Sequence, residues 1–456
     1  MRFRRPLARS SFVALLLLPS CGGGSSGSDS ADGGTNATPA PANARYDVAF
    51  GTTTFLAAPE NGAMAALDGG DVIVSALTAD GSLFAARLGP AAEVRWAKTY
   101  KGTTPEFLVS HVVVVGNRVV VTASSQSDDG VHLVDLDGSS GVVTKSRNVS
   151  GACMYPARSR ILADGGLVVS CSSEAAHYLR LNASSDVTWS KSGRAGGDVH
   201  VLSDGFAFVG VSSSLTPVNP SAPTGPQVGT GAAVHLVSND GVSKGWTFMG
   251  PGPGSHSVGG VRALPDGKLL VALGVDSTRA DSPASLSPLV LATFGSDGSA
   301  GTMARADMTT KDANGRDVPL QFGGAKMVTA VGDETWIGFV ANSGRLGSDV
   351  RGSVLARFAA DGSAKDAVLG AIVAAPTTGG ASLAFAWNDG RMTFHRAAPG
   401  AADCTTRPSL TLRSITPFLD KKAAADSALT DVPSTATDRP LTEAVVTGTT
   451  TPACGK

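Results

Sequence analysis

A pattern of short strands and tight turns recurs along most of the chain and limits the folds available to it. One unit reads as a strand, a turn rich in Asp, Asn and Gly, a β-branched strand, a loop, a third strand, a second turn and a fourth strand that often carries tryptophan. The third copy ends in DVTWSKS, which echoes EVRWAKT in the first, and the seventh copy, GASLAFAWNDGRMTFHRAAPG with PSLTLRSITPF, is more degenerate. Such units cannot bury their hydrophobic faces alone, so neighbouring units must stack.

Four short strands per unit, repeated seven times, predict an all-β chain folded as a β-propeller of seven four-stranded blades. In DVIVSALT and GLVVSCS the β-branched residues form short runs between turn residues, and no helical period extends beyond them. Ring closure would protect the sheet edges, while each blade buries its faces against its neighbours. A solenoid and two stacked β-sandwiches are the alternatives that this pattern leaves open.

The units resemble the degenerate propeller repeats of exported bacterial proteins, in which LPDGK or LADGG precedes a β-rich strand and a later DG turn precedes a tryptophan strand. The resemblance covers about residues 62–400. It implies an architecture and leaves the activity open, because such blades occur in binding proteins, assembly factors and enzymes alike.

The first residues combine a basic segment, a short apolar run and a cysteine. Four arginines precede an apolar run over residues 12–18, which suits a secretory signal and is too short for a membrane span. The following LPSC resembles a bacterial lipobox, which implies cleavage before Cys21 and lipidation of that residue. Pro19 departs from the usual residue at its position, so release by an ordinary signal peptidase is the alternative.

These features divide the chain into three parts. Residues 1–20 are the predicted signal peptide, and residues 21–44 hold the lipidated cysteine and a flexible linker of small and polar residues. Residues 45–456 form the propeller and a C-terminal tail. Because Gly22 follows the cysteine, the aspartate that retains lipoproteins in the inner membrane is absent, and we expect an outer-membrane lipoprotein of the bacterial cell envelope.

Four cysteines follow Cys21, and their even number favours disulfides in an oxidising compartment. The order in the sequence suggests that Cys153 pairs with Cys171 and Cys404 with Cys454. The second disulfide would hold the polar C-terminal tail. No Cys-x-x-Cys or Cys/His spacing supports zinc, so we expect neither a metal nor another cofactor.

The charge balance argues against two classes of partner. The chain carries 37 Lys and Arg against 38 Asp and Glu, a net charge of -1, and both signs are interspersed. Neither nucleic acid nor an anionic membrane surface is therefore indicated by charge. The expected partners are the membrane, reached through the lipid on Cys21, and envelope proteins or glycans.

Two patterns that resemble metal sites have plainer interpretations. DLDGSSG at residues 135–141 places two acids in one loop, but it lacks the later bidentate acid of an EF-hand and falls where other units have a turn, so an Asx turn is preferred. His132, His177 and His235 lie in third strands, where packing is preferred over metal binding. The sequence also contains no His-Glu-x-x-His or Walker motif, and its Gly-x-Ser-x-Gly matches, residues 23–27 and 241–245, lie in the small-residue linker and beside an Asp-Gly turn, where no nucleophile elbow is expected.

Basic residues recur in the first strand of several units. Arg160, His200 and Arg262 each lie four residues before the aspartate of the turn, and His111 and Lys326 lie in the corresponding strand at a different spacing. The innermost strands of a propeller line its central channel, so equal positions in successive blades converge there. These five residues are therefore candidate ligands for a carboxylate, phosphate or sulfate group. The alternative is that they pair with acids of adjoining blades.

Taken together, the sequence favours a lipid-anchored envelope protein that serves as a binding or interaction module and is not an enzyme. The first alternative is a propeller enzyme acting on a polysaccharide or another envelope substrate, which would require two carboxylates, or a base and metal ligands, close together at the channel mouth. The second is a structural envelope protein whose channel is closed by side chains.

Overall fold

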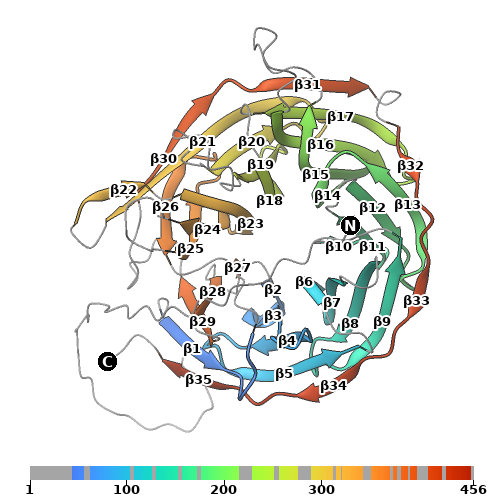
Figure 1. Ribbon diagram of the computed structural model, residues 1–456, viewed down its shortest axis with the longest axis vertical. Coiled ribbons are helices and arrows are strands. Elements are labelled where there is room, and N and C mark those ends of the chain that lie inside the picture. Colours follow the sequence, from blue (N-terminus) through green and yellow to red (C-terminus); the bar gives the residue numbers. More distant parts are fainter. Residues whose placement is uncertain are drawn as a thin grey trace, which may run out of the picture.

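A ring of sheets forms the molecule (Figure 1). The computed structural model describes residues 44–55, 62–102, 107–125, 130–151, 157–171, 176–214, 229–250, 256–275, 289–311, 315–319, 321–342, 351–369, 373–376, 382–388, 391–397, 409–423 and 428–452. The strands over these ranges form seven separate antiparallel sheets arranged around a centre, each of them one blade. The prediction of an all-β propeller is confirmed.

Each of the first four blades consists of four consecutive strands that run in order from the inner strand to the outer. Blade 1 contains β2 (Gly62–Ala66), β3 (Val72–Leu77), β4 (Leu83–Leu88) and β5 (Val94–Lys101). Blade 2 contains β6 (Phe107–Val115), β7 (Arg118–Ser125), β8 (Gly130–Asp137) and β9 (Val143–Ser150). Blade 3 contains β10 (Ala157–Ile161), β11 (Leu167–Cys171), β12 (Ala176–Leu181) and β13 (Val187–Gly193). Blade 4 contains β14 (Gly196–Leu202), β15 (Gly205–Ser214), β16 (Gly229–Ser238) and β17 (Ser243–Gly250).

The remaining blades complete the ring with the help of the N-terminal strand. Blade 5 contains β18 (His256–Ala263), β19 (Leu269–Val275), β20 (Leu289–Phe294) and β21 (Ala300–Lys311), with the short β22 (Asp317–Pro319) beside β21. Blade 6 contains β23 (Gln321–Val331), β24 (Glu334–Asn342), β25 (Arg351–Phe358) and β26 (Ala364–Leu369). Blade 7 contains β27 (Val373–Pro376), β28 (Ser382–Asn388) and β29 (Arg391–Ala397), and its fourth strand is β1 (Ala44–Ala49), which pairs with β29.

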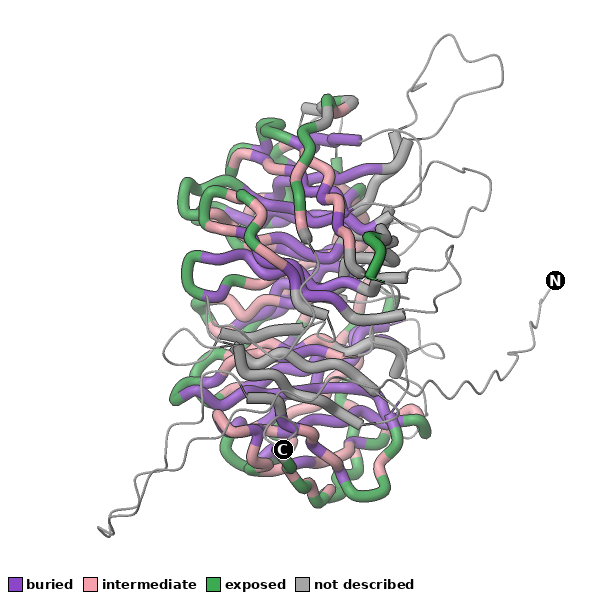
Figure 2. Tube along the Cα trace, turned by 90° about the vertical axis from the view of Figure 1, so that its left-hand side faces the viewer, coloured by how far each residue is buried: buried purple, intermediate pink, exposed green. Residues whose placement is uncertain are grey.

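Hydrophobic residues between adjacent blades form the core. All six residues of β3 are buried, because a strand inside a blade is covered on both of its faces. One cluster joins Ile73 and Leu83 of blade 1 to Val119 and Val134 of blade 2, so a blade is stabilised by its neighbour. Figure 2 shows the buried positions along the middle of the strands and the exposed turns at one end.

The hairpin turns share one design, and the stretch GGVRALPDGKLLVALG contains one of them. Gly267 donates its backbone N–H to the carbonyl of Leu264, and the Asp266 carboxylate accepts the N–H of Lys268. Gly267 has a φ of +80°, a conformation that glycine adopts without strain. Turns between first and second strands and between third and fourth strands lie at one end of the ring, which we call the turn face. Pro265–Gly267 is therefore scaffold, as its recurrence in the sequence indicates.

Tryptophan side chains of two outer strands connect one blade to the next. Trp96 of blade 1 donates its indole N–H to the carbonyl of Gly138 in blade 2, and Trp189 of blade 3 donates to Asn239 in blade 4, both at 2.9 Å. The arginines opposite these tryptophans donate to the same carbonyls at 3.1 and 2.7 Å, Arg87 to Gly138 and Arg180 to Asn239. We call this pair of contacts the Trp/Arg contact.

The C-terminal tail forms a belt around the outside of the ring, visible as red and orange strands in Figure 1. Its six strands run past the blades in reverse order, each antiparallel to an outer strand: β30 (Ser409–Ile415) on β21, β31 (Phe418–Ala423) on β17, β32 (Thr430–Asp431) on β13, β33 (Ala436–Asp438) on β9, β34 (Thr442–Val445) on β5 and β35 (Thr449–Pro452) on β1. The expectation that PSLTLRSITPF belongs to the seventh unit is wrong. The N-terminal β1 fills that place, so the later strands are free to extend other blades.

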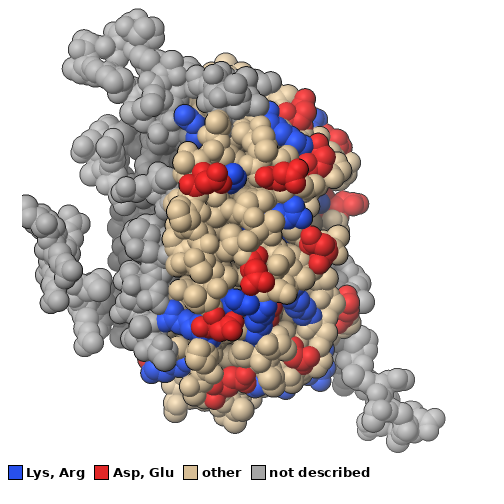
Figure 3. All heavy atoms as spheres, turned by 90° about the vertical axis from the view of Figure 1, so that its right-hand side faces the viewer, with Lys and Arg blue, Asp and Glu red and all other residues tan. Residues whose placement is uncertain are grey.

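Ion pairs at equivalent positions hold the belt to three successive blades. A basic residue lies four residues after the first valine of each of these outer strands: Lys98 in β5, Arg147 in β9 and Lys191 in β13. Each forms an ion pair with a carboxylate of the belt. The pairs are Lys98 with Glu443 at 2.8 Å, Arg147 with Asp438 at 2.9 Å and Lys191 with Asp431 at 2.5 Å. Figure 3 shows acidic and basic side chains interspersed over the outer wall, so their charges are largely matched locally.

Several predicted features fall outside the described residues. These are the signal peptide, Cys21 and the linker up to residue 43, together with Cys153, Cys404 and Cys454. Cys171 is buried at the end of β11 and is disulfide-bonded, but its predicted partner lies outside the described ranges. Both pairings stay predictions. In the part of the chain that the structure describes, no helix is long and apolar enough to cross a membrane.

Removal of Glu443 is expected to destabilise the protein more than removal of Asp431. The Glu443 carboxylate accepts both Lys98 and the backbone N–H of Val143 at 2.8 Å, whereas the Asp431 side chain is 86% exposed. Glu443→Ala should lower the free energy of unfolding by about 1 to 2 kcal/mol, because a charge-assisted hydrogen bond and an ion pair are both lost. Asp431→Ala should cost at most about 0.5 kcal/mol. Urea unfolding measures both, and equal losses would contradict the expected difference.

Candidate functional site

The innermost strands surround the centre of the ring. They are β2, β6, β10, β14, β18, β23 and β27, and each contacts the next around the circle. Four of the five predicted channel residues can be followed on these strands, His111 on β6, Arg160 on β10, His200 on β14 and Arg262 on β18. Lys326 lies on β23, but its side chain is outside the described part of the structure.

The register of the inner hairpins places these residues at two levels. Arg160 lies opposite Val168, His200 opposite Ala207 and Arg262 opposite Leu270, so all three are close to the hairpin turn. His111, opposite Thr122, lies one level deeper. Two further charged residues share that deeper level, Arg158 opposite Ser170 and Asp198 opposite Val209.

Asp198 connects three consecutive inner strands. Its side chain is 1% exposed, and one of its oxygens accepts a hydrogen bond from the Arg160 guanidinium at 2.9 Å. The other oxygen accepts the backbone N–H of Val261 on β18 at 3.0 Å. Gly260 makes this approach feasible, since a Cβ there would lie 3.0 Å from the same carboxylate oxygen. A single carboxylate thus joins blades 3, 4 and 5.

His111 caps the exposed edge of β10 in the same way. The backbone N–H of Ser159 points away from β11 and donates to Nδ1 of His111 at 3.2 Å. The Ser159 hydroxyl lies 2.7 Å from that of Thr122, so blades 2 and 3 share a second polar contact. Capping of inner edges by side chains from the preceding blade satisfies backbone groups that a sheet edge would otherwise leave unpaired.

Arg262 does not join this cluster. Its guanidinium donates to the backbone carbonyl of Glu334 and, at 2.7 Å, to the hydroxyl of Thr335, both at the start of β24 in blade 6. Burial lowers the pKa of Arg262, and Asp333 nearby opposes this change. The structure therefore brings together His111, Arg160 and His200 and places Arg262 in the contact between blades 5 and 6.

His111, Arg158, Arg160, Asp198 and His200 form a group that we call the channel cluster, which holds two guanidinium groups and one carboxylate. Burial lowers the pKa of Arg158, Asp198 raises it, and Arg160 lowers it again by repulsion. Burial also lowers the pKa of His200, with Arg160 adding to the effect and Asp198 opposing it. Both histidines are therefore neutral near pH 7, so the charged groups of the cluster are the two guanidinium groups and the carboxylate.

Arg158 and Asp198 are the members that the spacing argument missed. The position four residues before the turn aspartate identifies Arg160 and His200, but it does not include the position two residues earlier in the same strand. The sequence does indicate both residues, because side chains at i and i+2 of a strand lie on one face. ARSRI places Arg158 on the face of Arg160, and DVHVL places Asp198 on the face of His200.

The loop that resembled a calcium site is an ordinary turn. Asp137 accepts the N–H and the hydroxyl of Ser140, and Arg118 donates to Asp135. The carbonyl of Gly138 accepts the side chains of the Trp/Arg contact, and both carboxylate oxygens of Asp137 accept hydrogen bonds, from Ser140 and Asn117. Over the described ranges, no group of three or more His, Cys, Asp or Glu side chains is placed to hold a metal ion.

The histidines of the third strands lie in three different blades and serve as packing residues. His235 lies 2.9 Å from the Ser243 hydroxyl and 3.3 Å from the Tyr178 hydroxyl, and Arg439 lies 3.1 Å from His132. His177 stands on β12, opposite Cys171.

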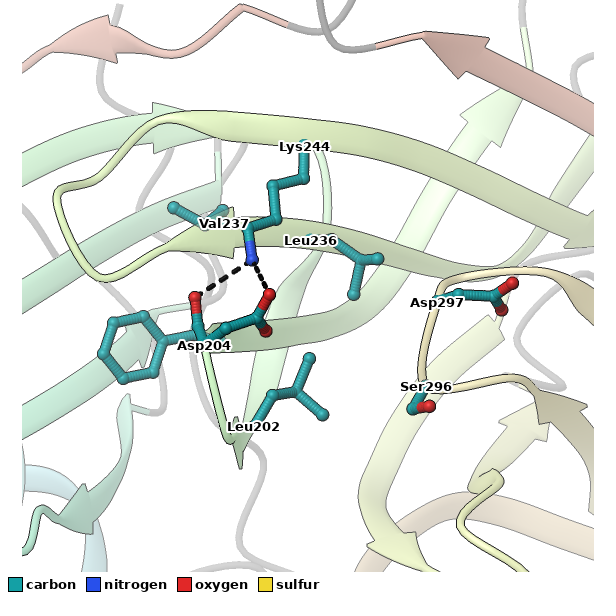
Figure 4. Close-up of a pocket in the computed structure, with 8 residues that line it drawn as sticks. Leu202, Asp204, Leu236, Val237, Lys244, Ser296 and Asp297 are labelled. Atoms are coloured by element: carbon teal, nitrogen blue, oxygen red, sulfur yellow. Dashed lines mark hydrogen bonds and ion pairs between the residues drawn. The ribbon is translucent and has the colours of Figure 1, made fainter.

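A pocket of about 240 Å³ opens on the turn face between blades 4 and 5 (Figure 4). Its walls are formed by Leu202, Phe206, Leu236 and Val237, and its polar lining by Asp204, Lys244, Ser296 and Asp297. Lys244 donates to the carboxylate and to the backbone carbonyl of Asp204. The hydrogen bond from Lys244 lowers the pKa of Asp204, which is the reverse of what a general acid requires.

Comparisons with known proteins assign no family to the chain. No family model matches it, and no curated protein matches it. A protein of unknown function from Bacteroides caccae is 11% identical at a TM-score of 0.35, covering 70% of this chain and 91% of that one. The plexin A4 extracellular region is 9% identical at 0.40, covering 77% and 52%. An engineered GH43 glycoside hydrolase is 9% identical at 0.26, covering 86% and 99%.

Acidification is expected to destabilise the protein through His111. Burial lowers the pKa of His111 well below its usual value, and Arg158 and Arg160 lower it further. The unfolded chain binds the proton near pH 6.5 and the folded chain only at lower pH, so stability is lost as the pH falls below about 6.5. His111→Gln keeps an acceptor for Ser159 and should flatten the loss between pH 7.5 and 5.5 in urea unfolding. His177→Gln is the control, and an unchanged pH dependence in His111→Gln would contradict this role.

Proposed function

We propose that this chain is a lipid-anchored binding module of the bacterial cell envelope that takes an anionic group at the channel cluster. The observation that carries the proposal is the partly exposed guanidinium group of Arg160 on an inner strand. Arg158 lies on the same face of β10, Arg160 donates to Asp198 at 2.9 Å, and the Arg160 side chain is still 29% exposed. A carboxylate or phosphate is the ligand that such a pair of guanidinium groups recognises best.

The rest of the fold supports a module whose site is rigid. Side chains that cap the inner edges, the Trp/Arg contacts and the belt all connect one blade to another. Pre-organised groups lose little conformational entropy when a ligand binds. A site held in this way is suited to recognition of a ligand whose charge is presented on a stiff backbone, such as an acidic envelope glycan.

The enzyme alternative has less support in the described residues. The pocket between blades 4 and 5 does contain two carboxylates, Asp204 and Asp297, as a hydrolytic site would require. However, Asp204 is held by Lys244 and Asp297 accepts the N–H of Ser299 within its own turn. The hydrogen bond from Lys244 lowers the pKa of Asp204, whereas proton donation requires a raised pKa.

Replacement of Arg158 by lysine is expected to weaken anion binding. Lysine keeps the charge but loses the planar pair of donors, which should reduce affinity for glucuronate or inorganic phosphate by about tenfold, or about 1.4 kcal/mol. Isothermal titration calorimetry at low salt measures the effect. Arg262→Lys serves as the matched control, because Arg262 contacts blade 6 and lies outside the cluster. Absence of saturable anion binding, or equal losses in both variants, would overturn the proposal.

Attachment through Cys21 is tested separately from ligand binding. In a bacterial expression host, the wild-type chain should fractionate with membranes, and its N-terminal peptide should carry a diacylglyceryl mass. Cys21→Ala removes the acceptor sulfur, so the chain should leave the membrane fraction or keep its signal segment. Cys171→Ala controls for loss of a cysteine elsewhere in the chain. Membrane association that is unaffected by Cys21→Ala would argue against the anchor.

A further inference from the structure

The pocket between blades 4 and 5 occupies the place that a tryptophan and an arginine fill in two other blades. The third strands of blades 1 to 6 carry a bulge, and in blades 1, 3 and 4 the residue before it pairs with an outer-strand residue. In blades 2 and 6 the corresponding pairs are of opposite charge, Asp135 with Lys145 and Arg357 with Asp366. In blade 1 that pair is Arg87 with Trp96, and in blade 3 it is Arg180 with Trp189. In blade 4 the register gives Leu236 with Gly245. The two largest side chains of the Trp/Arg contact are thus absent from this interface.

The turn glycine of the following blade confirms the equivalence. A Cβ on Gly141 would meet the Trp96 ring at 2.7 Å, and a Cβ on Gly241 would meet the Trp189 ring at 3.0 Å. The same position in blade 5 is Gly298, and there the nearest atom is a methyl of Leu236 at 3.1 Å. Leucine therefore lies where an arginine and an indole stand elsewhere, and the remaining space is the pocket seen in Figure 4.

The strand geometry in blade 4 keeps a tryptophan of the chain itself out of this space. Gly245 has a φ of +140°, which L side chains rarely adopt, so the outer strand has no Cβ at the position of Trp96 and Trp189. The neighbouring Trp246 is 3% exposed and stacks on Phe248, with centroids 6.0 Å apart, and Arg194 lies over its ring. It packs in a separate cluster that contains no residue of the pocket lining.

The pocket retains the features that an indole meets in the other blades. Trp189 donates its N–H to the carbonyl of Asn239, which lies two residues before Gly241. Two residues before Gly298 stands Ser296, which lines the pocket. Leu202 and Leu236 supply an apolar wall, whereas Phe206 and Val237 are buried in the cluster toward blade 3. The volume of about 240 Å³ exceeds the roughly 150 Å³ in which an apolar protein cavity holds benzene.

We infer that this pocket binds a planar aromatic group with an N–H donor, of the indole type, in the place of the missing tryptophan. The ring lies against Leu202 and Leu236, and its N–H donates to the carbonyl of Ser296. The ligand is a free indole-like molecule or a tryptophan side chain of a partner polypeptide. The site is separate from the channel cluster, and neither depends on the other.

Calorimetric titration of the full chain with indole tests the inference. We expect one saturable site in the wild type. Leu236→Arg restores the arginine of blades 1 and 3, fills the pocket and competes for the Ser296 carbonyl, so it should weaken indole binding at least tenfold. The matched control is Val242→Arg, which introduces the same side chain at an exposed position of the same blade. A circular dichroism spectrum like that of the wild type and cooperative urea unfolding show that Leu236→Arg remains folded.

Two further ligands, indene and N-acetyltryptophanamide, and one further variant, Trp189→Gly, test the inference. Indene has the shape of indole without the N–H, so it should bind severalfold more weakly. Trp189→Gly in blade 3 should create a second indole site and raise the stoichiometry from one to two. If N-acetyltryptophanamide binds in addition to indole, a tryptophan side chain is favoured as the natural ligand. If it is excluded, a free molecule is favoured. No saturable indole binding in the wild type, or full retention in Leu236→Arg, would overturn the inference.

Discussion

Pairing of β1 with β29 is the interaction on which the rest of the structure depends. Hydrophobic clusters of the described residues join neighbouring blades, so the ring needs a complete seventh blade to leave no face open to water. Blade 7 takes only three strands from its own stretch of sequence, and β1 completes it from about 350 residues away. The hydrophobic interfaces fix the number and order of the blades. Once this arrangement is closed, the inner strands meet around the centre and the outer strands present a continuous wall to the belt.

Polar groups in this protein act mainly between blades, and they do so at three distances from the axis. Near the centre, His111 and Asp198 cap the N–H groups of the following strands. At the turn face, indole and guanidinium groups donate to carbonyls of the next blade. At the periphery, cations of the outer strands meet belt carboxylates, and exposed pairs of that kind contribute up to about 1 kcal/mol each. Burial of apolar surface thus supplies most of the stability, and the polar contacts fix how adjacent blades are oriented.

The sequence shows the propeller clearly and the belt hardly at all, and the difference has a physical cause. Blade strands such as VIVSAL are buried on both faces, so each appears in the sequence as a continuous apolar run. Asp-Gly turns mark the ends of these runs. The belt strands β32 to β35 have two to four residues and are mostly exposed, so no hydrophobic pattern distinguishes them from a loop. Basic residues of the inner strands were found by their spacing, but the partner of each depends on the neighbouring blade. The roles of Asp198 and of the Leu236–Gly245 pair can be recognised only when the strand registers of different blades are compared.

The reversed course of the belt brings both ends of the propeller chain into one sheet. In blade 7, β1 lies between β29 and β35, so it is hydrogen-bonded along both edges. Tension on the residues before Ala44 would therefore enter the molecule along a strand that is clamped on two sides. Such a load acts on the two ladders in shear, so several hydrogen bonds have to yield together, whereas a strand at a free edge would peel away one bond at a time. The fold is therefore suited to withstand a pull on its N-terminus, the mechanical load that the proposed lipid anchor would apply.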